Sequence, residues 1–457
     1  MATGYLSKTF GSAGNQKTFT TSVWLKRTVG TIANGDFSNT TYILSYDGGG
    51  SPIKRGAIWM YDTGGLVWGC NPSGSVWEPE SNVQLNGTTV LFRDPSAWYH
   101  IVFAVDTTQA TASDRLKCWI NGVQYSMSAY PAQNLDTGYN NSYTYNINRY
   151  APNGVNVSDV ALSHFHQIDG TAYDASYFGE FDATTGIWKP KTQPSVTYGT
   201  NGFFLKFENS GSMGLDSSGN GNDFTVNGNL TQTVDTPSNV FVTLNPSIKS
   251  NASITFNYGN TSVTGANGVA WLGAMGTIGA TKGKWYAEAK ITDPLNFSIG
   301  FAKFGGTFQK DIGTPNNGYL GIGNDSWGFW GNGASANLFH TNTGTSYGSV
   351  TSTNDIIMLA MDLDNGNLYW GKNGTWFNSS NPATSTSPAF SGINIDEYIT
   401  FGTGVEGGSV QWNFGNGYFG TTAVSSATSD ESGLGIFEHT VPNGYNCLCT
   451  KNINTYG

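Results

Sequence analysis

The chain has 457 residues and a formal net charge of −10 at pH 7, and only 11% of its residues are charged. This acidic balance, with no long run of Lys or Arg, argues against general binding to nucleic acid or to an anionic membrane surface. The 61 glycines, the 14% of aromatic residues and the scarcity of Glu, Lys and Arg favour short strands joined by polar turns over helices.

No apolar run approaches the roughly 20 residues of a membrane-spanning helix, so we expect no membrane insertion. The first residues, MATGYLSKTFGSAG, lack the basic and apolar parts of a signal peptide. We therefore expect the protein to fold where it is made and to stay soluble. A chain of this length has room for two or three domains, each with a core of its own.

The first segment, residues 1–190, is dense in strand patterns. The stretches Thr20–Lys26, Trp98–Asp106 and Leu116–Val123 resemble successive strands of the laminin G and concanavalin A-like lectin group. In that group, an aromatic-His-hydrophobic strand is followed by an aliphatic strand that ends in Asn-Gly. Asp159–Gly170 is similar to the closing strand of the group. The resemblance implies a β-sandwich over this segment.

A connector is expected over residues 191–250. It contains the turn-forming stretches LDSSGNGNDF, DTPSN and LNPS, whose Gly, Asn and Pro content indicates turns and short strands wrapped on neighbouring elements. At the other end of the chain, residues 430–457 keep an apolar spacing, so we expect this tail to be ordered rather than linker-like.

The second segment, residues 251–429, has the sharper resemblance. Five of its stretches occur in the order that is typical of SPRY domains, and they are Gly283–Thr292, Phe297–Lys303, Asn324–Trp330, Asp355–Trp376 and Val410–Phe419. The resemblance implies a second bent β-sandwich on the concanavalin-like plan. The predicted fold class is therefore all-β, with two concanavalin A-like jelly-roll β-sandwiches in tandem.

Within the second segment, the residues DLDNG begin at Asp362 and place two aspartates one residue apart, as in a calcium loop. Counted from Asp362, the sixth position holds Asn367 and the twelfth holds Asn373, where that loop requires Gly and a bidentate Glu. The apolar run before the aspartates and the Asn-Gly pair at 365–366 favour a two-residue hairpin turn. We predict a hairpin without a metal ion, and a further turn at the Asn-Gly pair at 373–374.

Recognisable catalytic motifs are missing. Glycanases on the concanavalin-like sandwich usually carry Glu-x-Asp-x-Glu on one strand, so that alternate carboxylates face a cleft. The sequence has no such string, and its nearest pairs, Glu78 with Glu80 and Glu180 with Asp182, lie in turn-like sequence. It also has no G-x-S-x-G and no P-loop. We therefore predict that the protein is not an enzyme and needs no cofactor.

Metal binding is not expected either. His164 and His166 would share a face of a regular strand, but a third ligand is not evident beside them. The cysteines lack zinc-finger spacing and are too few for a disulfide framework. Free thiols are expected at all four of them, which are Cys70, Cys118, Cys447 and Cys449.

Sugar recognition is the chemistry that the composition favours, because sugars combine apolar C–H faces with hydroxyl groups, and aromatic rings with planar amides match both. We predict core positions for four tryptophans, namely Trp24, Trp119, Trp285 and Trp412. The candidate glycan-binding residues lie in expected loops and strand ends, and they are Trp77, Tyr143, Tyr145, Trp327, Trp330 and Trp376.

The whole chain, including GEFDATTGIWKPK and the ending GYNCLCTKNIN, resembles virion appendage or fibre proteins of bacteriophages of marine bacteria. The resemblance implies a virion surface protein, as a fibre, tail or capsid-decorating appendage, that is made in the host cytoplasm. Its partners would be other virion proteins and a host-surface glycan. Weak contacts from several copies, in a homo-oligomer such as a trimer, would add up to firm attachment. The alternatives are a purely architectural virion protein and a polysaccharide depolymerase.

Overall fold

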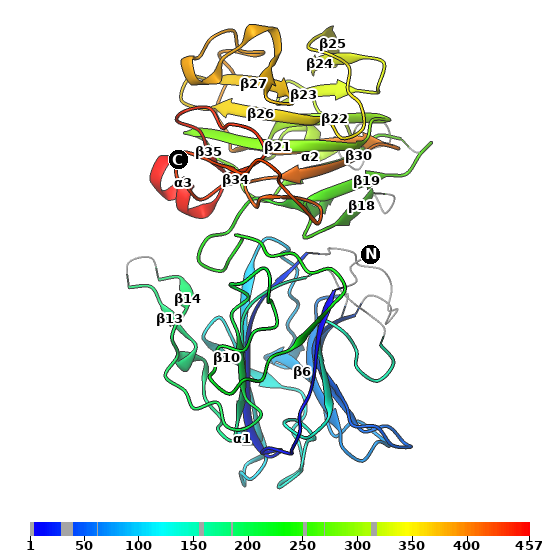
Figure 1. The fold of residues 1–457 in the computed structure, drawn as a ribbon, viewed down its shortest axis with the longest axis vertical. Helices are drawn as coiled ribbons and strands as arrows, with labels where there is room; N and C mark the ends of the chain where they lie inside the picture. Colours follow the sequence, from blue (N-terminus) through cyan, green and yellow to red (C-terminus); the bar gives the residue numbers. More distant parts are fainter. Residues whose placement is uncertain are drawn as a thin grey trace. The chain divides into compact units, whose positions relative to one another are not determined.

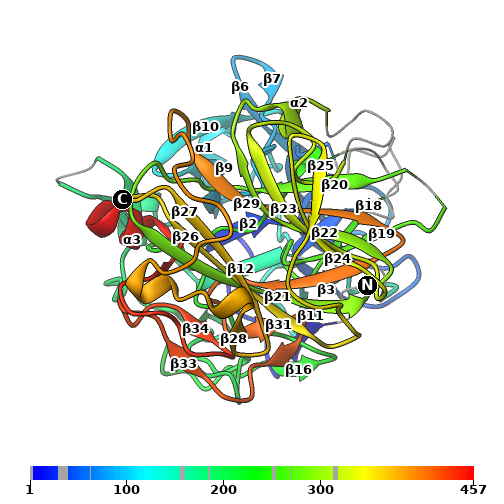
Figure 2. The same cartoon turned by 90° about the horizontal axis from the view of Figure 1, so that it is seen from above.

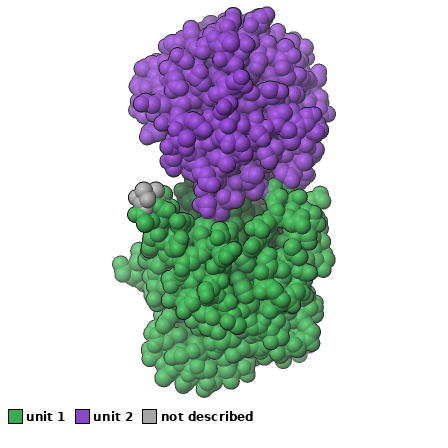
Figure 3. Space-filling model, turned by 60° about the vertical axis from the view of Figure 1, so that its left-hand side comes forward, with its two compact units in different colours: residues 1–232 green, residues 233–457 purple. Residues whose placement is uncertain are grey.

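The computed structural model is nearly all β, which confirms the predicted fold class (Figure 1). The chain forms two compact units, unit 1 (Met1–Gln232) and unit 2 (Thr233–Gly457), which Figure 3 shows in different colours. Residues 191–250, which the sequence indicated as a connector, are shared between the two units, and residues 430–457 are part of unit 2. The structure describes residues 4–28, 40–61, 63–154, 160–183, 186–249, 254–268, 270–311 and 318–457.

Unit 1 is built from one antiparallel sheet that folds over on itself around a core. In sheet order its strands are β15 (Phe203–Leu205), β12 (Val160–Asp169), β2 (Thr18–Arg27), β8 (Trp98–Asp106), β9 (Leu116–Ile120), β10 (Val123–Met127), β6 (Glu80–Leu85), β5 (Leu66–Asn71), β4 (Arg55–Met60), β3 (Thr41–Asp47), β11 (Thr144–Ile147), β1 (Tyr5–Thr9) and β16 (Thr225–Asn227). The short strand β7 (Thr88–Thr89) pairs with β6, and the helical turn α1 (Ala112–Arg115) precedes β9.

A stack of aromatic rings joins the two layers of this sheet. Tyr139 stacks on Phe19 of β2, with ring centroids 5.1 Å apart, and on Trp68 of β5, at 5.5 Å. Phe19 and Trp68 lie far apart in the strand order, and both are fully buried. The sheet is therefore closed by side-chain packing across the core as well as by hydrogen bonds between neighbouring strands.

The outer face of one layer of unit 1 is also covered. Because side chains alternate along a strand, Phe19 and Val23 of β2 enter the core, while Ser22 and Trp24 point to the opposite face. Over that face passes the segment 173–198. It contains the 3₁₀ turn η2 (Ala175–Tyr177) and the hairpin of β13 (Gly179–Phe181) and β14 (Trp188–Pro190).

Unit 2 is a sandwich of two sheets, and Figure 2 labels most of their strands. The seven-stranded sheet has the order β17 (Leu244–Lys249), β20 (Leu272–Gly276), β29 (Ile399–Glu406), β22 (Asn296–Lys303), β23 (Ser326–Gly331), β24 (Ala336–His340) and β25 (Thr343–Ser346). The second sheet has the order β18 (Ile254–Asn257), β19 (Ser262–Gly265), β30 (Ser409–Asn413), β21 (Lys284–Asp293), β26 (Ile356–Asp362), β27 (Asn367–Lys372) and β28 (Thr375–Trp376).

The core between these sheets contains three fully buried tryptophans, Trp285, Trp370 and Trp412. The indole N–H of Trp370 donates a hydrogen bond to the carbonyl of Ile299 in the facing sheet, at 3.2 Å. The core positions predicted for Trp285 and Trp412 are confirmed. The short helix α2 (Thr307–Asp311) follows β22 outside this core.

The DLDNG stretch is a hairpin turn between β26 and β27, as predicted, but the turn has four residues, 363–366, rather than two. The side chain of Asp362 explains the longer loop, because its Oδ1 accepts hydrogen bonds from the backbone N–H groups of Asp364 (3.1 Å) and Asn365 (3.0 Å). Lys284 pairs with its other oxygen at 3.2 Å. At 373–374 the predicted two-residue turn is confirmed between β27 and β28.

The C-terminal segment packs on the outer face of the second sheet of unit 2. Phe437 and Tyr445 of this segment form a buried cluster with Tyr286 and Tyr369 of the sheet. The elements that follow β28 outside the two main sheets are η3 (Phe377–Ser379), η4 (Pro382–Thr384), β31 (Tyr418–Phe419), β32 (Thr422–Ala423), β33 (Thr428–Ser429), β34 (Ile436–Phe437) and α3 (Thr450–Tyr456). The short strand β35 (Asn446–Cys447) pairs with β21 in parallel and so adds to the second sheet. None of the helices in the described residues has the length and apolarity to cross a membrane.

Glu288 of β21 fastens the C-terminal segment to the sheet. Its carboxylate accepts hydrogen bonds from the backbone N–H groups of Glu438 (2.9 Å) and His439 (2.8 Å) and from the hydroxyl of Tyr286 (3.0 Å). Burial raises the pKa of Glu288 from 4.5 to about 7, although these hydrogen bonds act in the opposite direction. The same carboxylate therefore links the docking of the segment to pH.

Replacing Glu288 by Gln tests this link. Because the folded-state pKa is raised, the contribution of Glu288 to stability is fully present below about pH 4.5 and is lost as the pH rises through about 7. We expect the thermal midpoint to fall between about pH 5 and about pH 8, and the fall to be smaller in Glu288→Gln. The exposed Glu431→Gln is the control and should keep the wild-type pH dependence. An equal fall in Glu288→Gln and in the wild-type chain would contradict the assignment.

Candidate functional site

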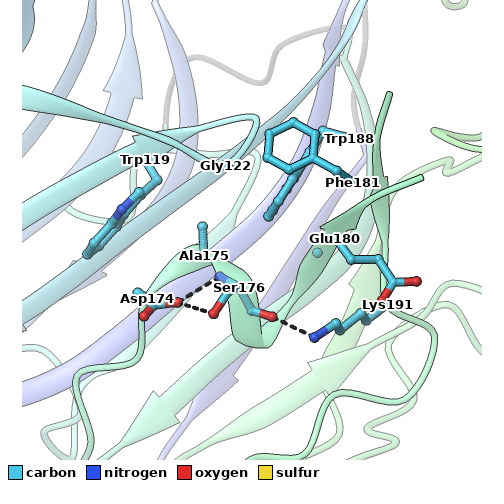
Figure 4. Close-up of a pocket in the computed structure, with 10 residues that line it drawn as sticks. Trp119, Gly122, Asp174, Ala175, Ser176, Glu180, Phe181, Trp188 and Lys191 are labelled. Atoms are coloured by element: carbon cyan, nitrogen blue, oxygen red, sulfur yellow. Dashed lines mark hydrogen bonds between the residues drawn. The ribbon is translucent and has the colours of Figure 1, made fainter. Parts of the chain in front are cut away.

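A hollow of 440 Å³ lies on unit 1, where the segment 173–198 crosses the outer face of the sheet (Figure 4). Figure 4 shows Trp119 of β9 on one side of it and Trp188 of β14, with Phe181 of β13, on the other. The turn η2 forms its floor in this view. The hollow thus combines aromatic walls with polar residues from a single short stretch of chain.

Trp188 is held by two glycines. A Cβ atom added at Gly122 would lie 2.6 Å from the indole ring, and one added at Gly179 would lie 2.5 Å from it. The ring therefore packs directly against main chain on both sides, and any larger residue at either position would displace it. Phe181, the cross-strand neighbour of Trp188, meets the ring at 70° with centroids 4.8 Å apart, and its side chain is 57% exposed.

The polar rim is anchored by η2. Asp174 accepts hydrogen bonds from the backbone N–H (2.8 Å) and the hydroxyl (2.6 Å) of Ser176, and the ammonium of Lys191 donates to the carbonyl of Ser176 at 2.7 Å. These bonds are drawn as dashed lines in Figure 4. Glu180 is exposed and pairs with Lys189 at 3.6 Å. The rim therefore presents carboxylate oxygens and an ammonium group within a defined backbone frame.

His100 supports the hollow from below. Its ring is fully buried and stacks on Trp24, with centroids 4.9 Å apart. The indole N–H of Trp188 donates a hydrogen bond to Nδ1 of His100 at 2.9 Å, and Nε2 lies 2.9 Å from the hydroxyl of Ser22. Because an indole nitrogen only donates, Nδ1 must be unprotonated, and the proton of neutral His100 is on Nε2. Burial and the nearby His164 lower the pKa of His100 to about 3.

The histidine pair of β12 does not form a metal site in the described residues. A β-bulge interrupts the strand between Ser163 and His166, and His164 has a positive φ of 45°. His164 lies 2.7 Å from the hydroxyl of Ser163, whereas His166 lies 2.9 Å from the hydroxyl of Tyr198 and has its pKa lowered by burial. No group of three or more His, Cys, Asp or Glu side chains that could hold a metal ion is present in the described part of the chain.

The four cysteines are buried and have free thiols, as predicted.

The carboxylate pairs of unit 1 form hydrogen bonds or ion pairs with neighbouring side chains. Glu80 accepts a hydrogen bond from the hydroxyl of Tyr61 at 2.6 Å, and Glu78 accepts one from the hydroxyl of Ser73 at 2.8 Å. The other pair, Glu180 and Asp182, shares Lys189.

The sequence-predicted glycan residues of unit 1 do not gather in the hollow. Trp77 is half-buried and packs on Trp59, with centroids 5.2 Å apart, in a cluster on the outer face of β4 and β5. Tyr143 is half-buried and stacks on Tyr46 at 5.4 Å. Tyr145 is 2% exposed within the core, so its ring presents no face to a ligand in this fold.

The predicted glycan-binding residues of unit 2 also lie in different places and form no common site. Trp327 is 4% exposed and stacks on His340 at 5.4 Å, so it is a core residue rather than a surface contact. Trp330 is half-buried on the outer face of the same sheet. Trp376 is half-buried and packs edge-on against Tyr286, with centroids 6.3 Å apart.

The sequence did not predict the hollow, because Trp119 was expected in the core and Trp188 was not among the candidate residues. The core positions predicted for Trp24 and Trp119 are both wrong. Trp24 is buried, but on the outer face of β2 against His100. Alternation along β9 sends Leu116 and Cys118 inward and Trp119 outward. Trp188 was not identified from the sequence at all. The signal that could have found it is the pairing of two aromatic residues, Phe181 and Trp188, across a short polar turn.

Comparison with known proteins identifies a SPRY domain in unit 2. The SPRY family model matches residues 284–417, which lie inside the segment predicted to have this fold. Among solved structures, the TRIM65 PSpry domain is 15% identical, with a TM-score of 0.29, and the match covers 38% of this chain and 91% of that chain. The SPRY domain of human HERC1 is 16% identical, with a TM-score of 0.29, and the match covers 37% of this chain and 96% of that chain.

The structure of stonustoxin is 18% identical, with a TM-score of 0.27, and the match covers 38% of this chain and 27% of that chain. The match of the SPRY family model confirms the sequence resemblance to SPRY domains for residues 284–417.

The protonation of His100 can be tested through its partner. We expect the His100 ring to stay neutral at about pH 5 and Trp188→Phe to raise its pKa, because the lost N–H bond stabilised the neutral form. A lowered folded-state pKa also means that this group's stability contribution is present above about pH 6.5 and is lost as the pH falls towards about 3. NMR titration of the ring carbons measures the pKa, with Trp119→Phe as the matched control. Titration of wild-type His100 near its ordinary value would overturn the assignment.

Proposed function

We propose that unit 1 binds carbohydrate in the hollow between Trp119 and Trp188, without catalysing a reaction. The observation that carries this proposal is the pairing of aromatic walls with a rim of exposed carboxylates and an ammonium group. The volume of the hollow, 440 Å³, falls within the roughly 300–1,000 Å³ of small-molecule sites. Such sites are mainly apolar, with a few polar groups in fixed positions. A sugar unit of a longer glycan has this same division into C–H faces and hydroxyls.

Each side chain has a distinct role in this proposal. The faces of Trp119 and Trp188 pack against sugar C–H groups. The carboxylate oxygens of Asp174 and Glu180 accept hydrogen bonds from sugar hydroxyls. The ammonium of Lys191 only donates, so it binds a hydroxyl or ring oxygen. Gly122 and Gly179 act indirectly, because they allow Trp188 to keep its position.

The location of the protein is part of the same proposal. The resemblance of the sequence to phage appendage and fibre proteins supports a place on a virion surface, with other virion proteins as partners and several copies, such as a trimer, in the assembly. The contacts at one hollow are few, so multiple copies would supply the attachment strength through effective concentration. The glycan would then belong to the surface of the host cell.

A second function is favoured by the SPRY match. SPRY domains are typically protein-interaction modules without catalytic activity, and the matched residues form most of one sandwich of this chain. On that basis unit 2 would join virion proteins to one another. In a chain of two units, the architectural role and glycan binding by unit 1 are compatible.

Glycan binding predicts a loss of affinity in two variants of the full chain. On an array of bacterial surface polysaccharides, we expect Trp119→Ala and Glu180→Gln each to weaken binding by about tenfold or more. Tyr398→Ala removes an exposed aromatic side chain of unit 2 and should leave the bound glycans unchanged. Equal binding by all three variants, or no binding by the wild-type chain, would refute the proposal. New reducing ends in the incubated polysaccharide would refute the absence of catalysis and favour the depolymerase.

The virion location has a separate test. Antibodies against the full chain, applied to purified particles in the electron microscope, should label a repeated position on each particle. Repeated labels that coincide with a fibre or spike would support an appendage. Labels on cell debris with unlabelled particles would refute the virion location and leave the glycan proposal standing.

A further inference from the structure

Four aromatic side chains form a cluster on the outer face of the seven-stranded sheet of unit 2, and each ring contacts two of the others. The ring centroids are 6.3 Å apart between Trp271 and Trp330, 5.7 Å between Trp330 and Phe339, 6.0 Å between Phe339 and Tyr319, and 5.5 Å between Tyr319 and Trp271. We call these four residues the outer aromatic surface. They come from β23, β24 and two segments outside the strands, so the fold alone brings them together.

Glycines on the outer face of the central strands let the segment that carries Tyr319 lie directly on the sheet. A Cβ atom added at Gly404 of β29 would lie 2.2 Å from the carbonyl oxygen of Gly318, and one added at Gly328 of β23 would lie 2.6 Å from that of Leu320. Main chain therefore packs on main chain over the central strands. This packing places Tyr319, which follows Gly318, between Trp271 and Phe339.

The four rings are held in place but not covered. Each of them is half-buried, which contrasts with the fully buried tryptophans of the sandwich core. The hydroxyl of Tyr319 donates a hydrogen bond to Oδ1 of Asn342 at 2.6 Å, and the ring of Phe339 lies against Gly344 of β25. All four residues of β25 are exposed. The surface therefore has fixed ring positions and an open side.

The polar groups that β24 and β25 supply next to the outer aromatic surface are uncharged. Asn337 lies directly opposite Trp330 in the β23–β24 pairing, and its side-chain amide makes no hydrogen bond within the part of the chain that the structure describes. Asn342 is exposed, and β25 adds two threonines and a serine. The sequence from 326 to 354 contains no Asp, Glu, Lys or Arg. The rim of the unit 1 hollow, in contrast, carries carboxylates and an ammonium group.

We infer that the outer aromatic surface of unit 2 is a second carbohydrate-binding surface, and that it takes a neutral polysaccharide. This inference rests on the proposed function of the chain as a glycan binder, but it concerns a separate site. Half-exposed ring faces match the C–H faces of a sugar, and the planar amide of Asn337 both donates to and accepts from hydroxyls. Residues 326–354, which carry Trp330 and Phe339, offer no Lys or Arg to an acidic glycan, and a net charge of −10 repels one.

The same chemistry excludes two other classes of ligand from the outer aromatic surface. A nucleic acid would meet an acidic protein with no Lys or Arg in the stretch 326–354. A quaternary ammonium ligand needs an open space between ring faces, whereas these rings pack on one another at centroid distances of 5.5 to 6.3 Å. The surface is a platform for one side of an extended chain of sugars.

The test uses affinity electrophoresis of the full chain in native gels that contain laminarin, dextran or mannan as neutral polysaccharides, or alginate as an acidic one. We expect at least one neutral polysaccharide to retard the wild-type chain and Trp330→Ala to weaken this retardation by about tenfold or more. Asn337→Ala, which removes a hydrogen-bonding group without opening a core, should weaken it in the same gels. Trp376→Ala removes a tryptophan of similar burial from the other sheet and is the matched control. Circular dichroism verifies the fold of each variant.

The outcomes separate this inference from the proposed function. Retardation that is lost in Trp330→Ala and Asn337→Ala but kept in Trp119→Ala supports the second surface. Retardation that persists in both unit 2 variants and is lost in Trp119→Ala refutes the second surface and supports the hollow as the only one of the two that binds. If none of the three neutral polysaccharides retards the wild-type chain, the inference is refuted, and glycan binding by the hollow is judged by the array experiment alone.

Discussion

Alternate side chains of a strand point to opposite faces of its sheet. The structure of both units therefore depends on which segments cover the outer face of each sheet. The inner faces form two cores, one closed by the Tyr139 stack and the other built around Trp285, Trp370 and Trp412. The outer faces also carry large apolar residues, which must be covered or remain in contact with water. In unit 1 the cover is the segment 173–198, and on the second sheet of unit 2 it is the C-terminal segment. Both candidate binding surfaces lie where such a cover is incomplete.

Glycine sets the distance between each cover and its sheet. Trp188 can reach His100 because Gly122 and Gly179 leave room for the indole ring, and the segment that carries Tyr319 can lie on β23 and β29 because Gly328 and Gly404 have no side chains. The abundance of glycine in this chain therefore has a structural use beyond turns. At these positions it allows main chain or an aromatic ring to pack against main chain.

The covers are also fixed by buried ionisable groups that burial keeps near or in the neutral form. Nδ1 of His100 accepts a hydrogen bond from the indole N–H of Trp188, and burial lowers the pKa of His100. Glu288 accepts two backbone N–H groups of the C-terminal segment, and burial raises its pKa. The two shifts have opposite signs for a base and an acid, as desolvation requires. Each group links the position of a cover to pH, one in unit 1 and one in unit 2.

The sequence by itself determined the all-β class, the two sandwiches and the SPRY domain of the second half, because strand periodicity, turn residues and motif order are local properties of the chain. It also determined the hairpin at DLDNG, although the length of the turn depended on hydrogen bonds to Asp362. Only the tertiary structure decided which aromatic residues are available to a ligand. Tyr145 and Trp327 are buried, Trp119 is turned outward, and Trp271 and Phe339 join a surface that no local pattern indicated. The reason is physical: periodicity gives the face on which a side chain lies, but whether that face is covered depends on segments that are distant in the sequence.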